Sequence, residues 1–380
     1  MKYRRCLSRY LQFPPLGFAW AAMSNGDLIA YYGTSGQGNK DGIYRQRVGR
    51  DPFRLGDLDL LTVEAKAGFL RLNADRSILY SIATGPDGRG LAKAFERTAE
   101  SGDLEPINSQ EAAGQGMCHI NLDRTERWLL GASYGDAMLS LFPLSSAGEI
   151  KPLVQSIRLE GEGSKVLPDR QEAPHAHSIY TDPSNRYAFV CDLGMDRIWL
   201  YRFDAETGRL ETAEKPFVQT AAGSGPRHLA FHGNGRWIYA LNELNGTVAH
   251  YDWDAEKGIL DPKDVASTLP EDFEELNISA EILVHPSNRF LYASNRGHDS
   301  LAVFRISESD GSLELIQRVP SGGGHPRNFV ISPEGDLLAV ANRDSNNIVY
   351  FAVDSKSGEL AALETVEGVP ACTCVRIVSS

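Results

Sequence analysis

One sequence pattern recurs along almost the whole chain, at intervals close to 50 residues. Each unit has a short apolar strand, a turn rich in Pro, Gly or Asn, a second strand, a polar turn and an alternating third strand. It closes with an acidic residue and Gly-x-Leu before a weaker fourth strand. The clearest copies begin at Gly225, Ser279 and Gly324, and the segments from Gly116 and Ala173 follow the same plan. Units of about 40 to 50 residues with four short antiparallel strands are typical of β-propeller blades.

Two columns of positions keep a constant offset of sixteen residues through seven consecutive units. The first column consists of Phe18, Gly68, Cys118, His177, Arg227, Ala280 and Arg327. The second column consists of Thr34, Thr84, Tyr134, Leu193, Glu243, Arg296 and Arg343. One interval is longer than the others because a polar insertion around 158–172 extends it, and we interpret this insertion as a surface loop. The seven units predict an all-β protein, a seven-bladed β-propeller of four-stranded antiparallel blades.

The two ends of a propeller must join, since an open edge strand leaves a row of backbone groups unpaired. We expect residues 1–17 to be an N-terminal extension and residues 18–380 to form the propeller as one domain. The segment 371–377 aligns with an inner strand and puts Ala371 in the first column. Phe18–Met23 competes for the same place. We favour the C-terminal strand as the one that closes the first blade.

Charge and hydropathy restrict the partners of the chain. Thirty-eight basic and fifty acidic residues give a net charge of −12, which argues against a nucleic-acid-binding surface. No apolar run approaches the roughly 18 residues of a membrane helix, so we expect no membrane partner. Five scattered cysteines predict reduced thiols and a cytoplasmic protein, and Pro14 and Pro15 interrupt the apolar stretch that an export signal needs.

The two columns are predicted to meet at one mouth of the central channel. In an antiparallel pair the start of one strand lies beside the end of the next, so the columns are neighbours at one rim of each blade. Charge concentrates in the last four units and fades in the first three, which favours a site on one side of the channel. The predicted cluster comprises His175, His177, Arg227, His228, Glu243, Arg296, Arg327 and Arg343. Its positive charge predicts a small anionic ligand.

Several of the neighbouring residues have structural interpretations. Asparagine recurs directly before the second column in three units, at Asn242, Asn295 and Asn342. We interpret these residues chiefly as turn-stabilising, with Asn242 also a candidate substrate contact. His175 and His177 form a His-x-His pair without an obvious third ligand, so we predict no metal and no other cofactor. Glu281 either faces the channel or pairs with an arginine.

Five strings occur in order and at blade spacing: PHAHS at 174–178, GPRH at 225–228, NELNG at 242–246, FLYASNRG at 290–297 and HPRNF at 325–329. In these strings the chain resembles the 6-phosphogluconolactonase-like lactonase family of seven-bladed propellers, which also includes fungal carboxymuconate-lactonizing enzymes. The resemblance covers residues from about 24 to 378. The string DPFRLG at 51–56 departs from the usual Asp-x-x-x-Gly-x-Leu ending of a blade. The resemblance implies that the catalytic residues are His177 (or His175), Arg227, Glu243 and Arg296.

Lactone hydrolysis suits these residue types. Attack of water on a lactone builds negative charge on the carbonyl oxygen, and guanidinium groups stabilise such charge. A phosphorylated sugar lactone also presents a dianion that arginine binds through its planar fork. The resemblance implies a hydrolase of 6-phosphogluconolactone in the pentose phosphate pathway, with which this chemistry is consistent and for which a monomer suffices. Glu243 is the preferred base because neighbouring arginines keep it ionised, and His177 is the alternative. The predicted substrate-binding residues are Asn242, His175, His228, Arg327 and Arg343.

Two other functions remain open at this point. A cycloisomerase acting between a muconate and its lactone would use the same arginines for carboxylates. A non-enzymatic propeller would use its rim to bind a partner or a small anion, since fold does not dictate function. The chain has no Ser-His-Asp nucleophile elbow and no phosphate-cradling glycine loop, so the sequence does not support covalent acyl transfer or nucleotide chemistry.

Overall fold

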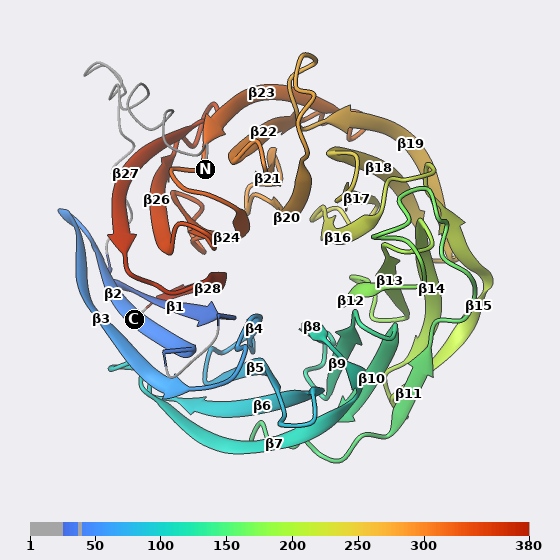
Figure 1. Cartoon of the computed structure of the whole chain (residues 1–380), viewed down its shortest axis with the longest axis horizontal. Helices are drawn as coiled ribbons and strands as arrows, with labels where there is room; N and C mark the ends of the chain where they lie inside the picture. Colours follow the sequence, from blue (N-terminus) through green and yellow to red (C-terminus); the bar gives the residue numbers. More distant parts are fainter. Residues whose placement is uncertain (1–25, 37–39, 380) are drawn as a thin grey trace.

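Seven four-stranded antiparallel sheets surround a central channel (Figure 1). The computed structural model describes residues 26–36 and 40–379. Every strand pairing within the sheets is between antiparallel neighbours, and each sheet is one blade of the ring. The predicted all-β, seven-bladed β-propeller is therefore confirmed. Within the described residues, no helix has the length and apolar character that a membrane span requires.

The strands of the seven blades form four concentric rings. From blade 1 to blade 7, the innermost strands are β28 (Cys372–Ser379), β4 (Leu70–Leu72), β8 (Met117–Leu122), β12 (Ala176–Thr181), β16 (Pro226–Phe231), β20 (Ile278–Val284) and β24 (Pro326–Ile331). In the same order, the second strands are β1 (Leu28–Thr34), β5 (Ile78–Thr84), β9 (Trp128–Ser133), β13 (Tyr187–Asp192), β17 (Trp237–Asn242), β21 (Phe290–Arg296) and β25 (Leu337–Asn342). The third strands are β2 (Gly42–Arg50), β6 (Arg89–Arg97), β10 (Met138–Pro143), β14 (Arg197–Asp204), β18 (Thr247–Asp254), β22 (Ser300–Ile306) and β26 (Asn347–Val353). The outer strands are β3 (Phe53–Val63), β7 (Leu104–Gln115), β11 (Gln155–Arg158), β15 (Arg209–Gln219), β19 (Ile259–Ser267), β23 (Leu313–Pro320) and β27 (Leu360–Glu367).

The hydrophobic core is divided into layers between adjacent blades. Between blades 6 and 7, for example, Tyr292 and Phe290 pack with Val340 and Phe351. Successive side chains of a strand point to opposite faces of its sheet, so each blade buries apolar residues against both of its neighbours. This packing explains why the second strands are apolar along most of their length. It also explains why the channel, rather than the core, receives the charged residues.

The C-terminal strand closes the ring, as predicted. β28 pairs antiparallel with β1, with Val375 opposite Tyr32, so blade 1 combines both ends of the chain (Figure 1). The competing segment Phe18–Met23 lies outside the described residues, as does the predicted boundary between residues 17 and 18. The extension and the single-domain boundary therefore stay predictions.

The predicted register of blade 1 is wrong by one or two residues. Ser35 N donates to Ala371 O at 3.1 Å in blade 1. The equivalent hydrogen bond in blade 5 runs from Glu243 N to Gly225 O at 2.8 Å. Ser35 rather than Thr34 therefore belongs to the second column. The pairing shifts at Thr373, which takes the first-column place that was predicted for Ala371. The prediction aligned Pro370 with Pro226, but Pro226 opens its strand whereas Pro370 precedes its strand by two residues.

β-Bulges explain the first column. In blades 3, 4, 5 and 7 the pairing of the two inner strands skips one residue, and the skipped residues are Cys118, His177, Arg227 and Arg327. A bulge leaves one residue out of the ladder and re-aims its side chain, which is why bulges are common beside active sites. The recurrent spacing in the sequence is thus the spacing of a local irregularity at the channel mouth.

The recurrent Gly-x-Leu ending joins neighbouring blades. Tyrosine hydroxyls on the second strands donate to the glycine carbonyl of the next blade in four pairs: Tyr31 to Gly102, Tyr80 to Gly148, Tyr239 to Gly311 and Tyr292 to Gly358. Blade 1 lacks this ending, and a different contact replaces it at the junction with blade 7. There the hydroxyls of Tyr350 and Tyr32 lie 2.6 Å apart, and Arg50 forms an ion pair with Glu334 at 2.9 Å. The unusual blade ending at 51–56 therefore coincides with a different set of contacts between blades 7 and 1.

Candidate active site

Glu243 lies at the mouth of the channel, directly after the second strand of blade 5. Its backbone N–H donates a hydrogen bond to Gly225 O. Gly225 adopts a φ of 59°, a conformation that suits glycine. The side chain is only 2% exposed. A carboxylate is costly to bury unless charged or hydrogen-bonded partners surround it. The surroundings of Glu243 meet that requirement.

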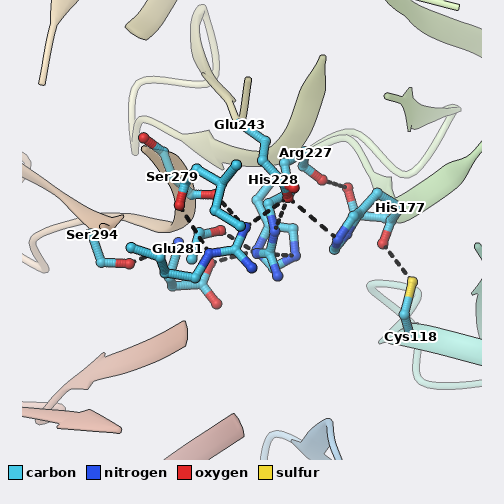
Figure 2. A network of polar contacts seen from close by, with 12 residues as sticks. Cys118, His177, Arg227, His228, Glu243, Ser279, Glu281 and Ser294 are labelled. Atoms are coloured by element: carbon cyan, nitrogen blue, oxygen red, sulfur yellow. Dashed lines mark hydrogen bonds and ion pairs between the residues drawn. The ribbon is translucent and has the colours of Figure 1, made fainter. Parts of the chain in front are cut away.

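Three arginines from different parts of the chain converge on this carboxylate, and Figure 2 shows one of them, Arg227, beside Glu243. Arg227 Nε and Arg296 Nη2 lie 2.9 and 2.8 Å from Oε2. Arg170 donates from Nη2 to the other oxygen, Oε1. Burial alone would raise the pKa of Glu243, but the charges of Arg296, Arg227 and Arg170 outweigh it and lower the pKa to about 2. Glu243 is therefore ionised at any physiological pH.

His177 is the imidazole nearest to this carboxylate. Its Nε2 lies 3.9 Å from Glu243 Oε2, and Figure 2 shows the ring pointing toward Glu243. Its Nδ1 is buried and has no hydrogen-bond partner among the described residues. Burial, reinforced by the charges of Arg227 and its neighbours, lowers the pKa of His177 well below 6.5. The ring is neutral and can exchange a proton with a group bound beside Glu243.

Arg327 is a half-buried cation of this mouth that has no partner among the described residues. Among the described residues its guanidinium makes no hydrogen bond and no ion pair, and burial together with Arg227 lowers its pKa to about 10. It lines a cavity of about 610 Å³ at the mouth. The polar or charged side chains lining that cavity also include Ser35, Lys66, Thr84, Gln115, Cys118, Arg343 and Thr373. A half-buried guanidinium that faces a cavity is a ready donor for a small anion.

A second polar network lies deeper in the channel. His228 Nδ1 lies 2.7 Å from Glu281 Oε1, and the other oxygen of Glu281 accepts from Asn328. Asn328 Oδ1 in turn accepts from Arg376 Nη1 at 3.1 Å. Burial lowers the pKa of His228 to about 4 despite the nearby Glu281 carboxylate. This network supports the mouth cluster from below, because His228 Nε2 also lies 3.1 Å from Arg227 Nη1.

The structure does not bring every predicted site residue to the open mouth. His175 Nδ1 lies 2.9 Å from Tyr134 O and its Nε2 lies 2.9 Å from Glu172, so both ring nitrogens are engaged. Asn242 donates to Thr247 Oγ1 at 2.9 Å within its own hairpin, which agrees with its interpretation as a turn residue. Both nitrogens of His228 likewise have protein partners.

Glu281 and the remaining asparagines behave as the sequence suggested. Glu281 both faces the channel and pairs, although with His228 rather than with an arginine. Asn342 donates to Ser321 O, and Asn295 bonds Thr268 and Ser279 within the same rim. No group of three or more His, Cys, Asp or Glu side chains in the described part of the chain is arranged to hold a metal ion.

Sequence reasoning missed Arg170 as a site residue. It lies in the polar insertion, which does carry a long loop between β11 and β12, and no other blade has an equivalent position. The only available signal was that the extra residues enter the chain just before the first-column residue His177, on the side of the mouth. Arg327 and Arg343 do line the mouth, and Arg343 also binds Asp344 at 2.6 Å.

This arrangement can bind an anion and transfer one proton. Arginines supply charge for an oxyanion, and a carboxylate beside a neutral imidazole can take and return a proton. The mouth cluster offers no serine or cysteine activated for covalent attack, since burial raises the pKa of Cys118 to about 11. Addition of water to an electrophilic carbonyl fits these groups.

Comparisons with known proteins agree with this chemistry. A protein-family model described as "Lactonase, 7-bladed beta-propeller" matches residues 29–377. The chain is 32% identical over 351 residues to a 6-phosphogluconolactonase of Bacillus subtilis, covering 92% of this chain and 98% of that protein. It is 35% identical over 302 residues to a 6-phosphogluconolactonase of Formosa agariphila, covering 78% and 84%. The solved structure of a periplasmic gluconolactonase of Pseudomonas aeruginosa superposes with a TM-score of 0.86 at 29% identity, covering 93% and 99%.

Proposed function

The chain belongs to the seven-bladed β-propeller lactonase family and is a lactone-hydrolysing enzyme, and on that premise we propose that its substrate is 6-phosphogluconolactone. Two relatives with that activity in their names align over most of their length, which supports the proposal. The structural observation that carries it is the partnerless guanidinium of Arg327, which lines the cavity at the mouth and lies close enough to Glu243 for their charges to interact. The product would be 6-phosphogluconate, consistent with a role in the pentose phosphate pathway.

The proposed reaction begins with a water molecule held beside Glu243 and His177. As the water oxygen bonds to the lactone carbonyl carbon, its proton passes to Glu243 or His177. Negative charge then develops on the carbonyl oxygen, where Arg327 stabilises it with the support of Arg227 and Arg296. Collapse of this intermediate breaks the bond from the carbonyl carbon to the ring oxygen. The ring oxygen takes the proton and leaves as the alcohol, so the hydroxy acid retains all atoms of the lactone and water, and it then releases one proton to the solvent to give the carboxylate.

The remaining predicted residues have supporting roles in this proposal. Arg343 and the hydroxyls of Ser35, Thr84 and Thr373 line the cavity beyond Arg327 and suit the hydroxyl groups of a sugar acid. His175 and His228 act through their neighbours, because protein groups already engage both nitrogens of each ring. We assign them to positioning rather than to contact with the reacting atoms.

A substrate panel tests the proposal. The purified chain should accelerate the opening of 6-phosphogluconolactone above its spontaneous rate, while Glu243→Gln should lose about 10²- to 10⁴-fold in kcat, the range of a general base. Activity of Glu243→Gln within a few-fold of wild type would remove Glu243 from the mechanism. Turnover of a carboxymuconate but of no sugar lactone would support the cycloisomerase alternative. Anion binding without turnover of any lactone would support the non-enzymatic alternative.

We also propose a cytoplasmic location. Four cysteines in the described residues are thiols, namely Cys118, Cys191, Cys372 and Cys374. Persistent thiols suit a reducing compartment. Fractionation of cells that make the full chain, with activity assayed in each fraction, tests this proposal. Activity confined to an exported fraction would contradict it.

A further inference from the structure

Arg170 is carried by a loop that is firmly anchored to the channel mouth. The loop, residues 159–175, connects β11 to β12 and has no counterpart of this length in the other blades. Gln171, which is fully buried, donates to Leu193 O at 2.9 Å and to Asp196 Oδ1 at 2.7 Å. Ser164 N also donates to Gly194 O at 2.8 Å. The anchor fixes the backbone next to Arg170, so only the arginine side chain needs to move.

The guanidinium of Arg170 differs from the two others that contact Glu243. The side chains of Arg227 and Arg296 are 3% exposed, whereas that of Arg170 is 34% exposed. The guanidinium of Arg296 also donates hydrogen bonds to Ile278 O at 2.9 Å and Ser279 O at 2.8 Å. The guanidinium of Arg227 donates to Ala280 O. Among the described residues the guanidinium of Arg170 makes no hydrogen bond to a backbone carbonyl, and its contacts are with the side chains of Glu243 and Tyr134. Arg170 is the member of the trio with access to solvent and without a backbone anchor for its guanidinium.

The three arginines also divide the two oxygens of Glu243 unequally. Arg227 and Arg296 both crowd Oε2 from within 3 Å. Within the described residues, Oε1 has one partner, the Nη2 of Arg170. A carboxylate oxygen needs an open lone pair to accept a proton from water. Oε1 is therefore the oxygen that Arg170 occupies, and departure of Arg170 would leave both of its lone pairs open to a water molecule.

From this division we propose that Arg170 is a positioning residue that leaves Glu243 for the anionic group of the substrate and so uncovers Oε1 when, and only when, an anionic lactone binds. The inference rests on the proposed function and adds a substrate class to it: lactones that carry a phosphate or a carboxylate. A phosphate accepts the planar fork of arginine in two parallel hydrogen bonds, whereas Arg170 contacts Glu243 through one oxygen only, its other side-chain partner being Tyr134. A neutral lactone leaves Arg170 on Glu243 and meets a weaker base.

The charges around Glu243 indicate the direction of the effect. Arg227 on β16, Arg296 on β21 and Arg170 on the loop lower the pKa of the carboxyl group. The other charged or titratable groups that face the cluster are Arg327 on β24, His177 on β12, Cys118 on β8 and Tyr134 after β9. Removing one of three cations raises the pKa of the carboxyl group, and a carboxylate of higher pKa is a stronger base.

Kinetics of Arg170→Met on two substrates test the proposal, with 6-phosphogluconolactone as the anionic lactone and δ-gluconolactone as the neutral one. We expect kcat/KM for the anionic lactone to fall about 100-fold, because its partner is lost. We expect kcat for the neutral lactone to rise several-fold, because Glu243 becomes a stronger base. The acid limb of the pH profile for the neutral lactone should also move to higher pH. Arg170→Lys, which keeps the charge, should restore part of the preference for the anionic lactone.

Lys165→Met is the matched control, since it removes the same charge from the same loop and its partner is the exposed Glu162. It should leave both activities unchanged. A second measurement does not depend on turnover of the phosphorylated compound: inorganic phosphate should inhibit wild-type hydrolysis of the neutral lactone, and Arg170→Met should be much less sensitive.

The outcomes separate the two proposals. An equal loss for both lactones in Arg170→Met, or no change for either, would overturn the role of Arg170 while the hydrolase itself stands. Failure of the wild type on both lactones would overturn the proposed function instead. If Arg170→Met does not fold, the same comparison with Arg170→Lys and the phosphate inhibition of the wild type decide the question.

Discussion

His228 Nδ1 lies 2.7 Å from Glu281 Oε1, and both side chains are buried beneath the Glu243 cluster. The other ring nitrogen, Nε2, lies 3.1 Å from Arg227 Nη1, a group that can only donate. Nε2 therefore accepts and Nδ1 carries the proton, so His228 is the neutral tautomer that joins Arg227 to Glu281. The ring holds Arg227 in the orientation in which it reaches Glu243.

Two substitutions of His228 separate its two bonds. The amide of His228→Asn reaches the position of Nδ1 and keeps the bond to Glu281, so we expect nearly normal stability but roughly tenfold lower kcat/KM, because Arg227 loses its support. The longer amide of His228→Gln reaches the position of Nε2 and leaves Glu281 with one donor fewer, which should cost about 1–3 kcal/mol of unfolding free energy. Urea denaturation and steady-state kinetics measure both effects. Identical losses in the two variants would contradict the assignment.

Arg327→Met should harm catalysis without harming the fold. The guanidinium has no hydrogen bond or ion pair to lose within the described residues, and its removal relieves repulsion from Arg227. Loss of an oxyanion donor typically lowers kcat by about 10²- to 10³-fold, and we expect that loss here together with an unchanged or higher Tm. Arg71→Met is the control, because Arg71 lines a separate cavity at the other end of the channel and should leave kcat unchanged. A marked fall in the Tm of Arg327→Met would show that Arg327 is structural.

The stability of the protein should depend on pH through Glu243. Its pKa is about 2 in the folded chain and near 4.5 when unfolded, so the unfolded chain binds more protons in acid. The stabilisation is complete above the unfolded pKa and is lost as the pH falls toward 2. We expect the unfolding free energy of the wild type relative to Glu243→Gln to shrink by about 2 kcal/mol between pH 6 and pH 3. A difference that stays constant over this range would show that the ion pairs do not hold the carboxyl ionised.

The glycine of the blade ending should tolerate no side chain. Gly311 accepts the bond from Tyr239 with a φ of 79°, and an added Cβ would lie 2.6 Å from Trp237. Gly235 has a similar φ of 70° but open space around it. Gly235→Ala should cost about 1–2 kcal/mol for the left-handed backbone alone, whereas Gly311→Ala should cost about 2–5 kcal/mol because crowding adds to the same backbone cost. Equal costs, measured by denaturant unfolding, would argue that the junction between blades 5 and 6 is loosely packed.

Periodic features of this molecule were predictable from its sequence, and aperiodic ones were not. The turn spacing follows from the blade repeat, and the first column marks bulges that recur at one height in the ring. Arg227, Glu243 and Arg296 were therefore predicted to meet, and they do. Arg170 was not predicted as a site residue, because it lies in an insertion that occurs in one unit only and cannot be aligned with the other units.

The spacing of the two columns also could not predict which hydrogen bonds and ring contacts each side chain makes. The spacing predicted that Arg327 and Arg296 lie at one mouth. It did not predict that Arg296 donates hydrogen bonds to Ile278 and Ser279 whereas the Arg327 guanidinium makes none among the described residues. His175 belongs to the same stretch as His177, yet its ring stacks on Tyr134 with centroids 4.3 Å apart. Such differences depend on three-dimensional neighbours from other blades, which alignment of one chain with itself does not reveal.

Blade 1 is shared between the two ends of the chain, and this has a consequence for biosynthesis. Until β28 has been made, β1 lacks its inner partner strand, and its backbone is open to pairing with other chains. A chain that lacks β28 would therefore be an aggregation-prone product rather than a slightly smaller enzyme.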